Sequence, residues 1–166
     1  MDFEAVYAQW FKPVYAYIRC RIWAENEAAD VAADVWQKVW EKRAQYDPTR
    51  GRVEQWLFGI AGHEVSSYCR RAYLRKIFSL SGFEENVPSD VSNDLGRMEI
   101  QEKTAALLSA MHGLAPREKE LIALKFYSGL NNREIAELVG KSESNVGTIL
   151  HRTFVRLRQR LEKYHE

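Results

Sequence analysis

One stretch near the C-terminus carries side chains that can hydrogen-bond to DNA, all on one side of an expected helix. Apolar residues between positions 142 and 162 recur at intervals of three and four, which predicts a single buried helical face. That face consists of Val146, Leu150, Phe154, Leu157 and Leu161. The opposite face carries hydroxyl, amide, imidazole and guanidinium groups, on Ser144, Asn145, Thr148, His151, Arg152 and Arg156. Amide and guanidinium groups can pair with base edges in the major groove, so this face predicts base reading in duplex DNA.

A shorter helix and a tight turn are expected directly before this helix. Residues 135–139 supply the apolar side of the shorter helix, and Gly140 supplies the positive φ that commonly ends a helix. Ser142 has a hydroxyl that can cap the helix that follows. Together these elements form a helix-turn-helix, whose second helix enters the major groove in DNA-binding proteins. Plain structural hairpins have the same shape, so the pattern favours DNA binding and leaves a structural hairpin as the alternative.

The charged residues are segregated along the chain, although the formal net charge is only +1. An acidic stretch comes first, with Glu25, Glu27, Asp30 and Asp34. Two basic stretches follow, with Arg70, Arg71, Arg75 and Lys76 in one and Arg152, Arg156, Arg158, Arg160 and Lys163 in the other. This asymmetry indicates different partners for different faces, while an ordinary solvated helix surface explains any single run equally well.

No catalytic or metal-binding motif stands out in the sequence. The segment GIAG at 59–62 lacks the glycine spacing and the lysine of a phosphate-binding loop. Cys20 and Cys69 are far apart and belong to no Cys/His cluster, so we expect no metal site. We therefore expect no enzymatic activity and no cofactor. The sequence has no secretory signal and no run of 18 apolar residues, so we expect no membrane insertion and a cytoplasmic protein with reduced thiols.

Three helices are expected in the first part of the chain, over residues 3–22, 26–44 and 53–78. Pro13 should kink or interrupt the first of them, and Asn26 can cap the second. The second helix carries two tryptophans, Trp36 and Trp40, whose spacing with nearby valines predicts core positions for both. The turn-rich segment 46–51 must be a loop.

The sequence predicts an all-α fold of two small domains. Residues 79–97 are rich in Ser, Asn and acidic residues and poor in large apolar ones, which predicts a flexible linker between a three-helix domain at 1–78 and a four-helix domain at 98–166. In the second domain Pro116 suits the start of a helix that Gly129 can close. Asn131 and Glu134 have the spacing of a capping box at the start of the next helix.

Several segments, taken in order, resemble one known family. They are AADVAADVWQKVW at 28–40, YDPTRG at 46–51, WLFGIAGHEVSSYCRR at 56–71, and the stretch from LAPREKELIALKFYSG to HRTFVRLR at 114–158. Each segment alone is a weak signal, but together they resemble the extracytoplasmic-function, or group IV, sigma factors of bacterial RNA polymerase. The resemblance covers nearly the whole chain, with a linker where the family has one.

The resemblance implies a role for each domain and for named residues. Residues 1–78 are then region 2, which binds core polymerase through Glu27, Asp30, Asp34 and Gln37. Region 2 also recognises and melts the −10 element, through Asp47, Arg50, Gly51, Trp56, His63, Ser67, Arg70 and Arg71. Residues 98–166 are region 4, which docks on the polymerase flap and reads the −35 element, through Ser142, Ser144, Asn145, Thr148, His151, Arg152 and Arg156. For Trp56 core packing is an equal alternative, and for His63 the alternative is an ordinary surface histidine.

The resemblance also implies the partners: core RNA polymerase, promoter DNA and, as in many members, an anti-sigma factor, with a monomer expected for the free protein. Two residues depart from the pattern, because Gly147 and Ile149 stand where members often carry Lys or Arg. Two other functions stay open from the sequence alone. One is a free-standing helix-turn-helix regulator that acts without polymerase, and the other, disfavoured by the lack of any nucleophile–base pair, is an enzyme.

Overall fold

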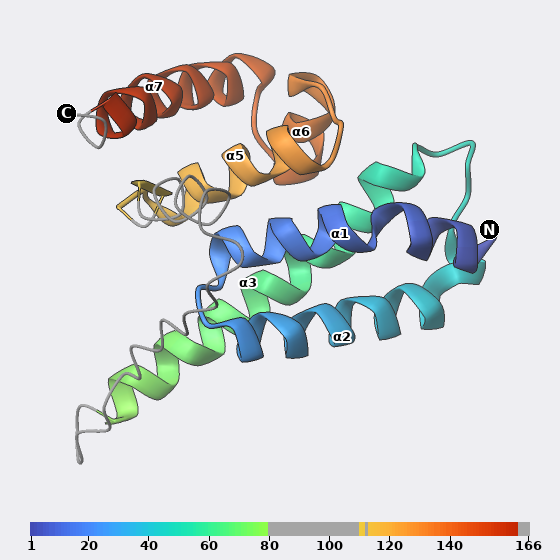
Figure 1. Ribbon diagram of the computed structural model, residues 1–166. Helices are drawn as coiled ribbons and strands as arrows, with labels where there is room; N and C mark the ends of the chain where they lie inside the picture. The colour runs from blue at the N-terminus through green and yellow to red at the C-terminus, as the bar shows by residue number, and fades with distance from the viewer. Residues whose placement is uncertain (80–109, 112, 163–166) are drawn as a thin grey trace, which may run out of the picture.

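The computed structural model describes residues 1–79, 110–111 and 113–162, and within these ranges every regular element is helical (Figure 1). The first part of the chain forms α1 (Phe3–Arg21), α2 (Glu25–Lys42), the short 3-10 helix η1 (Arg43–Gln45) and α3 (Val53–Ser79). The second part forms α5 (Pro116–Tyr127), α6 (Asn132–Val139) and α7 (Glu143–Glu162). The expected all-α fold is confirmed.

The first three α-helices pack around a core of fully buried side chains. Tyr17 of α1 contacts Phe58 of α3 edge to face, with ring centroids 5.4 Å apart, and Val35 of α2 is also inaccessible to solvent. Pro13 does not interrupt α1, contrary to one expectation. A proline removes a single helical hydrogen bond, and the buried residues that follow it, Val14 among them, hold the helix against the core.

Two sequence expectations for α2 are wrong. The helix begins at Glu25, with Ala24 rather than Asn26 as its N-cap and no side-chain hydrogen bond at the cap. Trp36 is buried as expected, but Trp40 is 49% exposed. Val39 takes the inward position in that turn of the helix and leaves Trp40 one residue further around, where Arg43 stacks on its ring at 3.7 Å.

The start and end signals of the second domain are confirmed. Pro116 is the first residue of α5, and Gly129 follows its C-cap with φ +68°. At the start of α6 the Asn131 side chain accepts a hydrogen bond from the Glu134 N–H at 2.9 Å, while the Glu134 carboxylate accepts one from the Asn131 N–H at 2.8 Å. Gly140 then has φ +64°. The first of the four helices expected in the domain at 98–166 lies almost wholly outside the described residues, as does the expected linker apart from Ser79, which ends α3.

The buried face of α7 differs at one position from the expected one. Val146, Leu150 and Leu157 are buried as expected, but Phe154 is 37% exposed and Thr153 is buried in its place. Thr153 satisfies its hydroxyl within the helix, since it donates to the Ile149 carbonyl at 2.7 Å. The spacing of 146, 150, 153 and 157 follows the helical period more closely, which turns residue 154 toward the edge of the face.

The two domains lie against each other in this structure. Figure 1 shows α5 between α1 and α7, and α5 packs along α1. Arg21 of α1 and Glu120 of α5 form an ion pair of 3.5 Å whose side chains are 9% and 16% exposed. The C-terminal end of α3 projects past the other helices, with Tyr73 and Leu74 exposed.

Candidate nucleic-acid and polymerase interfaces

The loop between η1 and α3 is built on a carboxylate. Asp47 accepts hydrogen bonds from the Thr49 backbone N–H at 2.9 Å and from the Thr49 hydroxyl at 2.7 Å. These hydrogen bonds lower the pKa of Asp47 below its ordinary value, so the carboxylate stays ionised. The Arg50 N–H donates to the Asp47 carbonyl at 3.1 Å and closes the turn. Asp47, expected at the −10 DNA, therefore already has a role in shaping the loop.

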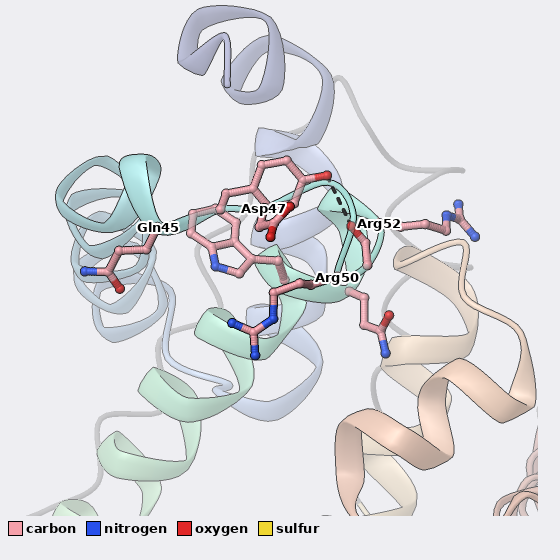
Figure 2. A pocket seen from close by; sticks show the side chains of 8 residues that line it. Gln45, Asp47, Arg50 and Arg52 are labelled. Carbon is pink, nitrogen blue, oxygen red and sulfur yellow. Dashed lines mark hydrogen bonds between the residues drawn. The ribbon is translucent and has the colours of Figure 1, made fainter.

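This loop and the start of α3 surround an open hollow of about 300 Å³. The Tyr46 hydroxyl donates to the Gly51 carbonyl at 3.3 Å, the bond drawn as a dashed line in Figure 2. The rings of Tyr46 and Trp56 lie 5.4 Å apart and are tilted by 49°. The lining residues are Gln45, Tyr46, Asp47, Arg50, Gly51, Arg52, Gln55 and Trp56. The hollow thus combines flat rings, amides and guanidinium groups.

Half of the lining residues were expected from the sequence and half were missed. Asp47, Arg50, Gly51 and Trp56 were expected at the −10 DNA, and the structure brings them together. Gln45, Tyr46, Arg52 and Gln55 were not among the expected residues. Arg52 and Gln55 both precede Trp56 and are three residues apart, a spacing that places them near one side of a helix.

Such a set of side chains suits an unpaired base. Aromatic rings offer a stacking surface, and base–aromatic stacking contributes about 1–3 kcal/mol per base. Amide groups can pair with the edge of a flipped base, and guanidinium groups can bind its phosphates. Trp56 is half-buried and lines the hollow, so both of its expected roles, core packing and DNA contact, fit its position.

The other expected −10 residues lie further along α3. His63, Arg70 and Arg71 are exposed, and Ser67 is half-buried. Their spacing puts His63, Ser67 and Arg70 on one side of the helix, with Arg71 beside them. From Trp56 to Arg71 the helix rises about 22 Å at 1.5 Å per residue. The hollow and the arginines thus mark two ends of one surface.

All of the expected −35 residues are on the surface of the second domain. Three of their side chains also have partners within the domain. The Ser142 hydroxyl accepts from the Asn145 N–H at 3.2 Å, as the capping role predicts, and Arg156 forms an ion pair with Glu118. The Thr148 hydroxyl donates to the Ser144 carbonyl at 2.9 Å. The exposed side chains for base contacts on the first turns of α7 are then Ser144, Asn145, Thr148, His151 and Arg152.

The expected polymerase-binding residues lie exposed along α2. Glu27 hydrogen-bonds to Tyr68 of α3, and burial together with this carboxylate raises the pKa of Tyr68 to about 12. The Gln37 amide donates to Glu41 at 2.9 Å. Asp30, Asp34 and Gln37 share the outer side of the helix, whereas Glu27 also serves the packing of α2 against α3.

No helix in the described ranges is long and apolar enough to cross a membrane.

Comparisons with known proteins agree with this arrangement. The sequence model described as Sigma-70 region 2 matches residues 6–75, and the one described as Sigma-70, region 4 matches residues 104–157. The ECF RNA polymerase sigma factor BldN of Streptomyces coelicolor is 26% identical over 156 residues, which are 90% of this chain and 56% of BldN. The RNA polymerase sigma factor YlaC of Bacillus subtilis is 26% identical over 165 residues, 98% of this chain and 94% of YlaC.

Solved structures show the same fold. The sigma factor RpoE of Bartonella quintana, in complex with the anti-sigma factor NepR, superposes with a TM-score of 0.78 at 22% identity and 97% coverage of both chains. CnrH, in complex with the cytosolic domain of CnrY, superposes with a TM-score of 0.67 at 20% identity, covering 97% of this chain and 88% of CnrH. Since the two region matches together take in most of the sequence, in the family's order, the chain belongs to the sigma-70 family and is a sigma factor of the extracytoplasmic-function type.

Proposed function

We propose that this protein directs core RNA polymerase to specific promoters, melts the −10 element with its first domain and binds the −35 element with its second. The observation that carries the proposal is the hollow at residues 45–56, which adjoins a DNA-facing helix side in a chain that also has a helix-turn-helix. The protein catalyses no reaction itself, and it works in the cytoplasm beside the polymerase. Region 2 comprises residues 1–78 and region 4 residues 98–166, with a linker at 79–97.

The residues divide into three contact sets. Core polymerase contacts Asp30, Asp34 and Gln37, with Glu27 at the edge of the set. Unpaired −10 bases enter the hollow, which is lined by Tyr46, Arg50, Gln55 and Trp56. Further along α3, His63 and Ser67 face the upstream −10 bases. Arg70 and Arg71 bind phosphates. The −35 duplex is read by Ser144, Asn145, Thr148 and Arg152, with Ser142, His151 and Arg156 at its backbone. The structure of RpoE with the anti-sigma factor NepR supports an anti-sigma factor as a further partner.

A free-standing regulator is the disfavoured alternative, because a simple helix-turn-helix regulator needs no region 2. The two functions differ in a single measurement. Bacterial core polymerase is incubated with a pool of templates randomised across the −35 and −10 positions, with and without the protein, and the run-off transcripts are sequenced. With a sigma factor, the transcripts start downstream of a −35 and a −10 sequence that the transcribed templates share. A free-standing regulator binds templates and yields no transcripts.

The same assay tests the hollow. Arg50→Ala combined with Trp56→Ala should abolish transcripts while binding to core polymerase stays normal. The matched control is Arg158→Ala, which removes an exposed arginine from the outer side of α7 and should leave transcript yield unchanged. Full transcription by the double variant would contradict the assignment of the hollow to the −10 element.

A further inference from the structure

The first turn of α5 makes polar contacts with both helices of the helix-turn-helix. The Arg117 guanidinium donates a hydrogen bond to the carbonyl of Val139, the last residue of α6, at 2.9 Å. The Glu118 carboxylate forms an ion pair with Arg156 of α7. Two neighbouring residues of α5 therefore bind one helix each, and the helix-turn-helix is held from outside as well as by its own turn.

Arg117 supplies a hydrogen bond that the end of α6 needs. The last four carbonyls of a helix have no partner within the helix. The N–H groups of Gly140 and Lys141 donate to the carbonyls of residues 137 and 136, and the Val139 carbonyl accepts from Arg117. A cation at this place also suits the negative end of the helix dipole. The turn from α6 to α7 therefore begins at a residue that Arg117 holds.

A carboxylate fixes the orientation of Arg117. One terminal nitrogen of its guanidinium donates to the Glu120 carboxylate at 2.8 Å, while the other terminal nitrogen donates to the Val139 carbonyl. The Glu120 side chain is only 16% exposed. Because the guanidinium is planar and its donors lie in a rigid fork, two partners on two nitrogens leave it a single orientation.

Glu118 also uses both of its carboxylate oxygens. Its Oε2 accepts from the Ala115 backbone N–H at 2.9 Å, at the start of α5, and its Oε1 pairs with Arg156. Glu118 is 15% exposed and Arg156 is 44% exposed. An arginine has five N–H donors, so Arg156 can pair with Glu118 and still bind a DNA phosphate.

The Glu118 contact is made on the base-reading side of α7. Arg156 lies about one turn after Arg152 and about three turns after Asn145, so the three side chains share one side of the helix. The opposite side packs through buried apolar side chains such as Leu150. Apolar packing is non-directional, whereas hydrogen bonds and ion pairs have a preferred geometry. The polar contacts therefore define how α7 is rotated about its axis better than its apolar side does.

We propose that Arg117 and Glu118 are positioning residues for reading of the −35 element. Resting on the proposed function, this means that Arg117 fixes the end of α6 and that Glu118 fixes α7 through Arg156. Together they set the angle at which α7 enters the major groove. Contacts to base edges need side chains held within about 0.5 Å of the productive geometry, so a small rotation of α7 weakens its choice between base pairs.

Two variants of the full-length chain each remove one of the contacts. Arg117→Met removes the hydrogen bond to α6 and keeps an unbranched side chain, and Glu120 keeps Arg21 as its ionic partner at 3.5 Å. Glu118→Gln removes the ion pair with α7, but its amide oxygen can still accept the Ala115 N–H, so the start of α5 stays capped. The two variants thus affect the two helices separately.

The measurement is selection of duplexes from a pool randomised at the −35 positions, by the full-length protein alone and with core polymerase. The readout is the enrichment of the preferred −35 sequence over its single-base variants. Partial misfolding lowers binding to every sequence equally, so this ratio does not respond to a loss of stability alone. Both variants should lose about tenfold in this ratio, as expected when one base contact is misaligned, and keep the −10 preference.

Glu162→Gln is the matched control, because it removes the same charge as Glu118→Gln and breaks the exposed Arg158–Glu162 pair on α7. It should select −35 sequences as the wild type does. An unchanged ratio in both Arg117→Met and Glu118→Gln overturns the proposal, as does an equal loss in the control.

A double variant tests whether Glu118 acts through Arg156. If it does, Glu118→Gln combined with Arg156→Gln should lose no more −35 discrimination than Arg156→Gln alone, because the two side chains then act as one unit. A further loss in the double variant would contradict this route.

The run-off assay separates this result from the proposed function. Promoter-dependent transcripts together with unchanged −35 discrimination in the variants overturn the positioning role and leave the sigma-factor function standing. A −35 sequence that the wild type selects without polymerase, and selects more sharply than the variants, supports the positioning role. If the wild type then yields no transcript with polymerase, the proposed function is contradicted while the positioning role stands.

Discussion

Asn145 and Arg152 are the two side chains on α7 best suited to distinguish base pairs. Both are exposed, and an amide can pair with adenine and a guanidinium with guanine in the major groove. We predict that Asn145→Ala and Arg152→Ala each relax specificity at one or two −35 positions, at a cost of about 1–3 kcal/mol, and leave the −10 preference unchanged. Selection from a randomised promoter pool measures this, with Arg158→Ala as control. Identical −35 preferences in both variants would place base reading in other residues or in DNA shape.

Two glycines of the second domain make opposite predictions for stability. Gly140 has φ +64°, so Gly140→Ala should lower the free energy of unfolding by about 1–2 kcal/mol. Gly147 lies inside α7 with negative φ, and an added Cβ would meet only the Asn132 side-chain nitrogen, at 3.8 Å. Gly147→Ala should therefore raise the free energy of unfolding by up to about 1 kcal/mol. Urea denaturation measures both changes, and a destabilising Gly147→Ala would contradict the conclusion that a methyl group fits at this position.

Helix α2 presents Asp30 and Asp34 on its outer side, away from the valines that it buries. We predict that Asp30→Lys with Asp34→Lys weakens binding to core polymerase about a hundredfold, because charge reversal across an interface costs several kcal/mol. Neither side chain is part of the core, so the circular dichroism spectrum should not change. The control is Glu143→Lys with Glu162→Lys, the same charge change on α7. Wild-type affinity in the α2 variant, measured by surface plasmon resonance, would rule out this side of α2 as the docking surface.

At the scale of the whole molecule, the Arg21–Glu120 pair couples the two domains. Glu120→Leu alone should separate the domains, because Arg21 loses its ionic partner in a largely buried position. Adding Arg21→Met should restore much of the packing, since an apolar pair of similar size needs no compensating charge. Denaturant unfolding measures this. The single variant should unfold in two steps, one for each domain, and the double variant in one step. A double variant that unfolds like the single one would show that the ion pair does not couple the domains.

Local chemistry was sufficient for the sequence to predict most helix boundaries in the described residues. Asn131 and Glu134 form the expected capping box, Pro116 starts α5, and Gly140 takes the expected positive φ. These features depend on residues three or four positions apart, so they can be predicted without knowledge of the tertiary structure. The predicted DNA-facing side of α7 depends on the same short-range periodicity, and its residues are exposed as expected.

Tertiary packing decided what short-range pattern could not. Trp40 and Phe154 have core-like spacing, yet both are substantially exposed because the neighbours Val39 and Thr153 take the inward positions. Tyr46 and Gln55 join the hollow only because the loop folds back on α3. The contacts of Arg52 and Gln55 with α6 join residues 82 positions apart in the chain. No periodicity spans such a separation, so only the packing of the domains brings these side chains together.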